Sequence, residues 1–139
     1  MKTHVLDANA LYRYLTNGDG ADQVERLLEQ TVAAGSVALM SVVNWGEVHY
    51  TLSRKVGIAE ADVILQSLEQ LPITIVALDK QQTRAAAILK SSFGLPYADC
   101  FAAALTGRTG VLVTADAKDF NRIPWLSTLP LPAHRARKS

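Results

Sequence analysis

Four acidic residues occupy junctions between predicted strands and helices, where their carboxylates could bind a cation together: Asp7, Glu47, Asp99 and Asp116. A β-favouring apolar stretch at residues 3–6 runs directly into the first of them. Crossovers between parallel strands are right-handed, so the carboxyl ends of the strands and the amino ends of the following helices line one rim of the sheet. We therefore expect the four side chains to gather at that rim.

Carboxylates held close together repel one another, and several unpaired acids at a crevice are destabilising unless a cation binds them. Hard oxygen ligands without an accompanying Cys or suitable His favour Mg²⁺ or Mn²⁺ over Zn²⁺. A magnesium ion held by carboxylates neutralises phosphate and activates water, so this pattern is typical of phosphoryl chemistry. Taken alone, Asp7 could instead only cap the helix that follows, and Glu47 could be an ordinary solvated helix residue.

Predicted strands and helices alternate along the chain without a linker or an internal repeat. Apolar periodicity, capping residues and glycine stops predict helices at residues 8–15, 21–33, 42–55, 59–71, 80–93 and 98–106. Apolar or β-branched runs predict strands at residues 3–6, 37–40, 73–78 and 111–114, with room for one short edge strand at 123–131. This alternation predicts an α/β fold, a three-layer α/β/α sandwich around a central, mainly parallel sheet.

Length and composition predict one globular domain at residues 1–132 and a basic, disordered tail at 133–139, in a chain of 139 residues that is 49% hydrophobic. Residues 1–132 carry 11 Lys and Arg against 13 Asp and Glu, a net charge of −2, which argues against a passive basic nucleic-acid binder. The single cysteine excludes an internal disulfide and a Cys-rich zinc site. We expect a cytoplasmic protein, because no spanning segment or signal-peptide pattern stands out.

Four motifs carry a family resemblance. They are Val5–Leu11 (VLDANAL), Ser41–Val48 (SVVNWGEV), Leu95–Ala104 (LPYADCFAAA) and Val113–Phe120 (VTADAKDF). Each motif alone is common, but in this order, in a chain of this size, they together resemble the PIN-domain ribonucleases and, within them, the VapC toxins of bacterial toxin-antitoxin pairs. The likeness covers nearly the whole chain.

The resemblance implies an endoribonuclease, dependent on Mg²⁺ or Mn²⁺, that hydrolyses RNA phosphodiester bonds and inhibits translation or growth. By position it assigns the catalytic, metal-binding acids as Asp7, Glu47, Asp99 and Asp116, and it matches three auxiliary residues, Asn9, Thr114 and Asp119. It also implies a cognate antitoxin and a homodimer. Family members leave a 5′-phosphate and a 3′-hydroxyl and need no catalytic His, and no histidine here forms a constellation with a nucleophile: His4, His49, His134.

Two other function classes stay open. One is a catalytically inactive PIN-like module that binds RNA or protein. The other is a different metal-dependent phosphohydrolase, such as an aspartyl-phosphate hydrolase, which also begins with a strand ending in Asp. Against that class, the residue two after Asp7 is Asn9 and not an Asp, and no Lys precedes the Asp116 motif in the expected way.

Several other residues have plainer interpretations. His49 lies about 200° around the helix from Glu47, which predicts a surface or packing role. Cys100 points about 100° away from Asp99, which predicts a buried small apolar residue. Asp119 could cap the short turn that follows it.

The sequence has more apolar surface than one side of a small sheet obviously needs, at Leu27, Leu28, Val48, Leu52, Val56 and the predicted helix at 59–71. All of it could be core. The resemblance favours instead a homodimer interface and a groove for an antitoxin segment.

Overall fold

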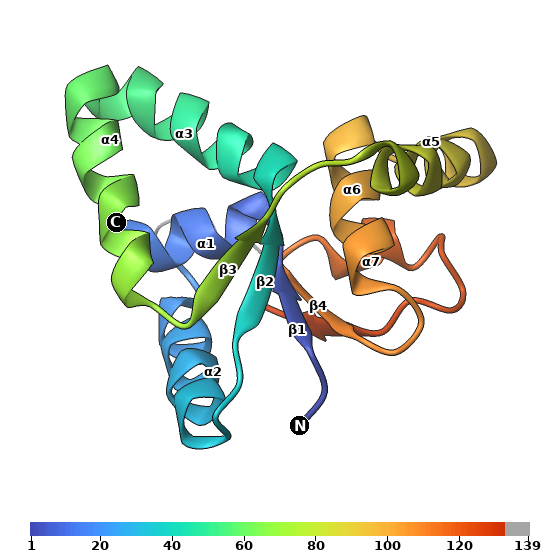
Figure 1. Cartoon of the computed structure of the whole chain (residues 1–139), viewed down its shortest axis with the longest axis horizontal. Helices are drawn as coiled ribbons and strands as arrows, with labels where there is room; N and C mark the ends of the chain where they lie inside the picture. Colours follow the sequence, from blue (N-terminus) through green and yellow to red (C-terminus); the bar gives the residue numbers. More distant parts are fainter. Residues whose placement is uncertain (133–139) are drawn as a thin grey trace, which may run out of the picture.

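The computed structural model describes residues 1–132, so the predicted tail at 133–139 lies outside the described residues. Its strands are β1 (His4–Leu6), β2 (Ala38–Ser41), β3 (Ile73–Val76), β4 (Val111–Thr114) and β5 (Thr128–Pro130). Its helices are α1 (Ala8–Leu15), α2 (Ala21–Ala33), α3 (Val42–Val56), α4 (Ile58–Gln66), α5 (Lys80–Phe93), α6 (Tyr97–Thr106) and α7 (Ala117–Phe120), with a 3₁₀ turn η1 (Ser67–Gln70) after α4. Figure 1 shows their arrangement.

One sheet organises the molecule, with the strand order β3-β2-β1-β4-β5. β1 lies in the centre, where Val5 pairs with Leu39 of β2 and Leu112 of β4. Within residues 1–132 every strand pair is parallel, which confirms the prediction of a mainly parallel sheet. The carboxyl ends of all five strands therefore lie on the same rim.

Successive residues of the central strands pack on opposite faces of the sheet, as the two-residue period of a strand requires. Leu6 and Val113 belong to a core with α1, α2, α3 and α4, whereas Val5 and Leu112 belong to a second core with α5, α6 and α7. Figure 1 shows these two groups of helices on either side of the sheet. The predicted α/β/α sandwich is confirmed. Both faces of the sheet are covered, which explains the nearly continuous apolar composition of its strands.

Helix starts agree closely with the sequence, because side-chain caps mark them. Asp7, Ser41 and Asp79 accept hydrogen bonds from the backbone N–H groups of Ala10, Val43 and Gln82, at 2.8, 3.2 and 2.7 Å. The predicted helices at 8–15, 21–33 and 80–93 have the observed bounds of α1, α2 and α5.

Two predicted elements end earlier in the structure, whereas the predicted edge strand is present. The helix expected at 59–71 ends at Gln66 and continues as η1, and the strand expected at 73–78 ends at Val76. The short strand expected within 123–131 is β5, which pairs with β4 at the edge of the sheet. An edge position suits it, because Pro130 has no N–H to donate to a further strand.

Most of the apolar residues that the sequence left without an obvious place are buried in the core. Leu27, Leu28, Val48 and Leu52 are buried, whereas Val56 remains 43% exposed. Further exposed apolar side chains lie on α4, at Ile58 and Val63. Among the helices of residues 1–132, none is both long enough and apolar enough to cross a membrane.

Candidate functional site

The sheet brings two of the predicted acids together at its rim. Asp7 follows β1 directly and is the N-cap of α1, and Asp116 follows β4 and precedes α7. Leu6 and Val113, close to the ends of these strands, pair in register, and the Asp7 N–H donates to the Val113 carbonyl at 3.3 Å. The proposed capping role of Asp7 is real, but it does not exclude a role in the site, because only 4% of the residue is exposed and other acids face it.

Thr114, the last residue of β4, contacts both of these acids. The residue is fully buried, its Oγ1 accepts a hydrogen bond from the Asp116 N–H at 2.9 Å, and its side chain hydrogen-bonds to the Asp7 carboxyl group. One hydroxyl can serve both partners, because it accepts from an N–H while donating to a carboxylate. Thr114 therefore fixes the relative positions of Asp7 and Asp116.

Glu47 and Asp99 complete the group from two helices, α3 and α6. Asn44, on the same side of α3 three residues earlier, donates from Nδ2 to Glu47 Oε1 at 2.9 Å and to the Ala98 carbonyl at 3.1 Å. The same amide thus orients the Glu47 carboxylate and ties it to the residue before Asp99. Both acceptors require the nitrogen of the amide, which leaves the buried Oδ1 of Asn44 without a partner in the described part of the chain.

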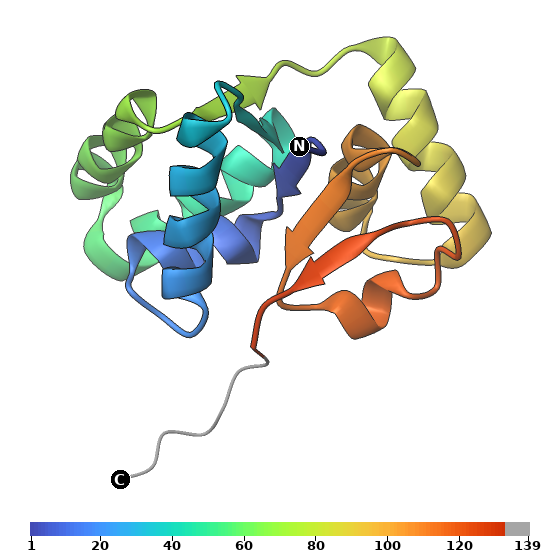
Figure 2. The same ribbon diagram turned by 90° about the horizontal axis from the view of Figure 1, so that it is seen from below.

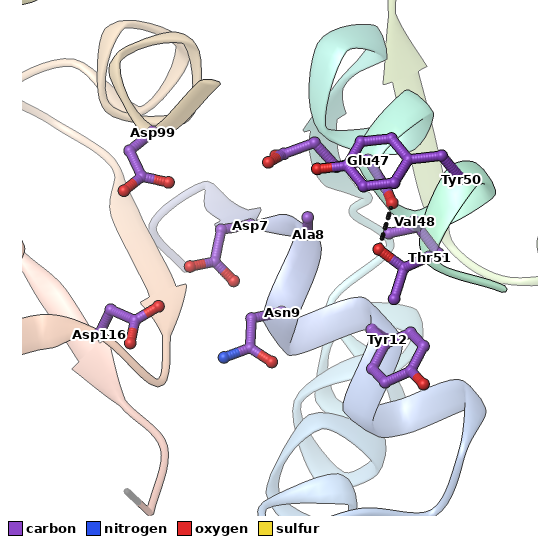
Figure 3. A pocket seen from close by; sticks show the side chains of 10 residues that line it. All are labelled: Asp7, Ala8, Asn9, Tyr12, Glu47, Val48, Tyr50, Thr51, Asp99 and Asp116. Atoms are coloured by element: carbon purple, nitrogen blue, oxygen red, sulfur yellow. Dashed lines mark hydrogen bonds between the residues drawn. The ribbon is translucent and has the colours of Figure 1, made fainter. Parts of the chain in front are cut away.

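These side chains surround an open cleft of about 270 Å³. Figure 3 shows Asp7, Asp99 and Asp116 on one side of it and Glu47 on the α3 wall. The cleft is lined by Asp7, Ala8, Asn9, Tyr12, Glu47, Val48, Tyr50, Thr51, Asp99 and Asp116. The structure therefore brings together the four predicted acids and Asn9. Thr114 lies beneath the cleft, and Asp119 is not part of its lining, although its charge acts on Asp99.

The electrostatics of the cleft favour a cation. Burial raises the pKa of Asp7 to about 7, with further contributions from the charges of Asp116 and Asp99, although hydrogen bonds from Thr114 and Ala10 oppose the rise. Burial also raises the pKa of Asp99 to about 6, assisted by the charges of Glu47, Asp116 and Asp119. In residues 1–132 no Lys or Arg forms a salt bridge with any of these acids. Within the described residues, no salt bridge therefore offsets their repulsion.

The donor set fits a hard divalent cation, since every candidate ligand is a carboxylate or amide oxygen. The geometry is open, however: among the described residues, no three acidic, His or Cys side chains lie close enough to form a ready-made metal site. Like charges without a counter-ion point apart, so the carboxylates would have to turn toward each other to bind a cation together.

His49 and Cys100, whose side chains often serve in catalytic or metal sites, lie outside this site, as expected. His49 contacts Asp62 through Nε2 at 2.8 Å and Ser53 through Nδ1 at 3.2 Å, and its ring packs against Trp45. Cys100 is fully buried in the core beside α5, and burial raises the pKa of its thiol. The predicted packing roles of both residues are confirmed.

Sequence reasoning missed four residues of the site, namely Asn44, Tyr12, Tyr50 and Thr51. Helical spacing could have indicated three of them, because Asn44, Tyr50 and Thr51 stand three or four residues from Glu47 on α3. The Thr51 hydroxyl donates to the Glu47 carbonyl at 2.8 Å (Figure 3). Tyr50 is 49% exposed, and Arg54 stacks on its ring. An exposed tyrosine beside an acidic cleft is a surface on which a nucleobase can stack.

The bridging role of Thr114 predicts a specific loss of stability. Thr114→Val keeps the branched shape but removes the acceptor of the Asp116 N–H, and the loss of such a hydrogen bond costs about 0.5–1.5 kcal/mol. We expect urea unfolding to show a loss in this range for Thr114→Val. The matched variant Thr114→Ser keeps the hydroxyl, so equal losses in both variants would contradict the bridging role.

Comparisons with known proteins agree with this geometry. A family model described as PIN domain matches residues 4–126. A chain in the crystal structure of VapBC2 from Rickettsia felis, bound to a DNA fragment from its promoter, superposes with a TM-score of 0.73 at 19% identity, covering 93% of this chain and 98% of that one. A chain of DNA-bound VapBC from Salmonella typhimurium gives a TM-score of 0.74 at 14% identity, covering 94% and 98%. A chain of a toxin-antitoxin complex from Klebsiella pneumoniae gives 0.65 at 21% identity, covering 91% and 97%. A search of curated protein sequences gave no significant match.

Proposed function

Because this chain belongs to the PIN-domain family, we propose that it is a metal-dependent endoribonuclease that hydrolyses RNA phosphodiester bonds, and that it acts as a VapC-type toxin. The observation that supports this most directly is the raised pKa of Asp7 and Asp99 in an open cleft where residues 1–132 supply no paired cation. Such a site stabilises bound cations and, through them, phosphate.

Each of the four acids has a distinct place in this proposal. Asp7, Glu47 and Asp99 would hold Mg²⁺ or Mn²⁺, and Asp116 would hold a second ion or orient the attacking water. A bound divalent cation activates water and offsets the charge that builds on the phosphoryl oxygens. Thr114 holds Asp7 and Asp116 in fixed relative positions, and Asn44 orients the Glu47 carboxylate. Asn9 lines the cleft and offers its amide to a water or phosphate oxygen. Asp119 acts through its charge on Asp99.

Incubating single-stranded RNA with the purified chain tests the reaction. We expect cleavage with Mg²⁺ or Mn²⁺ that stops on adding EDTA and resumes when metal is restored. Products should carry 5′-phosphates and 3′-hydroxyls. Cleavage that persists in EDTA, or that leaves 2′,3′-cyclic phosphates, would contradict the proposed chemistry.

A binding module without activity is the second candidate. The observation that favours it is the wide spacing of the acids, which form no ready-made metal site among the described residues. Calorimetric titration with Mn²⁺ distinguishes the enzyme from the inactive binding module. Saturable Mn²⁺ binding by the native chain, weakened in the Asp99→Asn variant, supports the enzyme. No Mn²⁺ binding up to millimolar concentrations supports the binding module.

We also propose a cognate antitoxin and a homodimer in the cytoplasm. A groove of about 650 Å³ lies beside α3, α4 and the free edge of β3, and its lining combines the apolar Trp45, Val63, Ile73 and Ile75 with the polar Asp62, Gln66 and Glu69. Exposed apolar surface of this kind marks interaction sites. The matched structures from Rickettsia felis and Salmonella typhimurium are VapBC complexes, which is consistent with such a partner. Light scattering that gave a monomer at micromolar concentration would count against the dimer.

The Asn44 amide should influence metal binding through Glu47. Removing a group that orients a ligand typically weakens metal affinity 10- to 100-fold. We expect Asn44→Ala to weaken Mn²⁺ binding by this factor in calorimetry. The control, Asn121→Ala, changes an exposed asparagine outside the cleft and should leave affinity unchanged. Equal affinities in both variants would show that Glu47 needs no such support.

A further inference from the structure

The two walls of the cleft differ in their chemistry. One wall carries most of the acids, and the other is lined by Tyr12, Tyr50 and Thr51. The second wall belongs to α1 and α3, which pack on one face of the sheet, whereas α6 and α7 pack on the other face (Figure 2). If the acids bind a phosphate through a cation, as the proposed function requires, the tyrosine wall contacts a neighbouring part of the same RNA strand.

Tyr50 is the tyrosine of this wall that a ligand can reach more fully. The Tyr12 ring packs against the hydrophobic core under α1, whereas Tyr50 is 49% exposed although it stands only three residues after Glu47. In Figure 3 the Tyr50 side chain extends from α3 toward the side of the cleft where the acids lie. Exposed aromatic rings of this kind are the surfaces on which proteins bind the unstacked bases of single-stranded RNA.

Arg54 adds a cation to this aromatic surface. Its guanidinium lies 5.1 Å from the centre of the Tyr50 ring, because residues four apart are neighbours on a helix. Arg54 is exposed and forms no salt bridge within residues 1–132. The guanidinium covers one face of the ring and keeps donors free for a phosphate. It therefore supplies positive charge that the lining of the cleft, which includes no Lys or Arg, does not.

Glu47, Tyr50 and Arg54 follow one another along one side of α3. Seven residues are close to two full turns, so Glu47 and Arg54 project in nearly the same direction and lie about 10 Å apart along the helix axis. Tyr50 stands between them. A phosphate held near Glu47, a base on Tyr50 and a further phosphate at Arg54 therefore succeed one another in the order in which an RNA strand presents these groups.

We propose that Tyr50 and Arg54 form a nucleotide subsite, which binds one unpaired base next to the phosphate that is cut. The base stacks on the open face of the Tyr50 ring, and Arg54 contacts an adjoining phosphate. A base paired within a duplex cannot stack in this way, so the subsite restricts the substrate to single-stranded loops and ends. Because every base has a π-face, the subsite selects an unpaired nucleotide and not a particular base.

Fluorescence anisotropy with a short labelled single-stranded RNA tests the subsite, in magnesium and in an Asp7→Asn background that suppresses cleavage. Tyr50→Ala removes the ring, whereas Tyr50→Trp keeps an aromatic surface. The control, Tyr97→Ala, removes a tyrosine of similar exposure, 45%, that is not part of the cleft lining. We expect Tyr50→Ala to weaken binding about 5- to 150-fold, the effect of replacing a stacking aromatic residue with alanine. Tyr50→Trp and the control should retain most of the affinity.

An abasic nucleotide distinguishes stacking from an indirect effect of Tyr50 on the fold. When one abasic position is moved along the RNA, one placement should weaken binding to the chain that contains Tyr50. The same abasic RNA should bind the Tyr50→Ala variant as well as the complete RNA does, because the stacking contact is already lost. A purely structural role produces no such coupling. An abasic nucleotide that weakens both chains equally at every position would overturn the proposal.

The phosphate contact of Arg54 is tested by Arg54→Gln, with Lys55→Gln as a control that removes the same charge from the next exposed residue. Since about 0.7 counter-ions are released per phosphate contact on a single strand, Arg54→Gln should lower the slope of log affinity against log salt by about 0.7, and Lys55→Gln by much less. Equal slopes would overturn the role of Arg54. A native chain that shows these binding effects but does not cut RNA would refute the proposed enzyme alone, whereas a chain that binds no RNA would overturn the subsite as well.

Discussion

Replacing Asp7 with Asn is expected to reduce RNA cleavage about 1000-fold or more while leaving the fold intact. Asp7 is the acid that the structure fixes most firmly, because α1, β4 and the Thr114 side chain all position it. If Asp7 binds the metal as proposed, loss of its charge removes several kcal/mol of charge stabilisation near the phosphate, and about 4 kcal/mol corresponds to a factor of 1000 in rate. Cleavage rates at saturating RNA and magnesium measure the effect.

Helix capping separates this catalytic loss from a folding defect. An Asn at the N-cap still accepts from the Ala10 N–H, and Asn and Asp are about equally good caps. The variant should therefore fold normally, as judged by circular dichroism. Asp22→Asn, in the first turn of α2 and outside the cleft, is the matched control and should cleave at the native rate. Equal cleavage by the Asp7 and Asp22 variants would remove Asp7 from the proposed mechanism.

Much of the fold could be predicted because the local signals agree with the tertiary structure. Caps at Asp7, Ser41 and Asp79 mark helix starts, and the apolar runs of β1 and β4 have no competing helical period. The end of α4 was missed for a physical reason. Leu65, Leu68 and Leu71 are spaced by three, which suits a 3₁₀ turn as well as an amphipathic helix, and only packing decides between them.

The candidate site was less predictable in its details than in its location. The rim position of the four acids follows from parallel strands and right-handed crossovers, which the sequence pattern implies. The supporting contacts depend on where distant elements meet: Asn44 reaches the Ala98 carbonyl, and Thr114 reaches the Asp7 carboxyl group. No local pattern reports such contacts. The open arrangement of the carboxylates likewise depends on their rotamers, which a bound cation would change.

The second large effect is a fall in the stability of the metal-free chain as the pH rises from 4 to 8. The Asp7 carboxyl group has an ordinary pKa of 3.8 and a folded-state pKa of about 7. Between these values the folded chain holds a proton that the unfolded chain has released, so the free energy of unfolding decreases with pH. The stabilising contribution is complete below about pH 4 and is lost once the pH passes 7. At about 1.4 kcal/mol per pKa unit, the loss is on the order of 4 kcal/mol. Asp99, with a pKa raised to about 6, acts in the same direction.

Thermal unfolding in EDTA at pH 5 and pH 8 measures this effect. At about 4 °C per kcal/mol for a domain of this size, the melting temperature should fall by roughly 10–15 °C between the two values. Asp7→Asn should remove most of the fall and unfold at a higher temperature than the native chain at pH 8, because no buried charge then forms. Adding Mg²⁺ at pH 8 should restore stability to the native chain, since a ligand that binds only the folded state stabilises it by mass action. If the melting temperatures of the native chain and the Asp7→Asn variant depended on pH in the same way, the Asp7 charge would not oppose folding. The argument for a cation at this rim would then rest on the family alone.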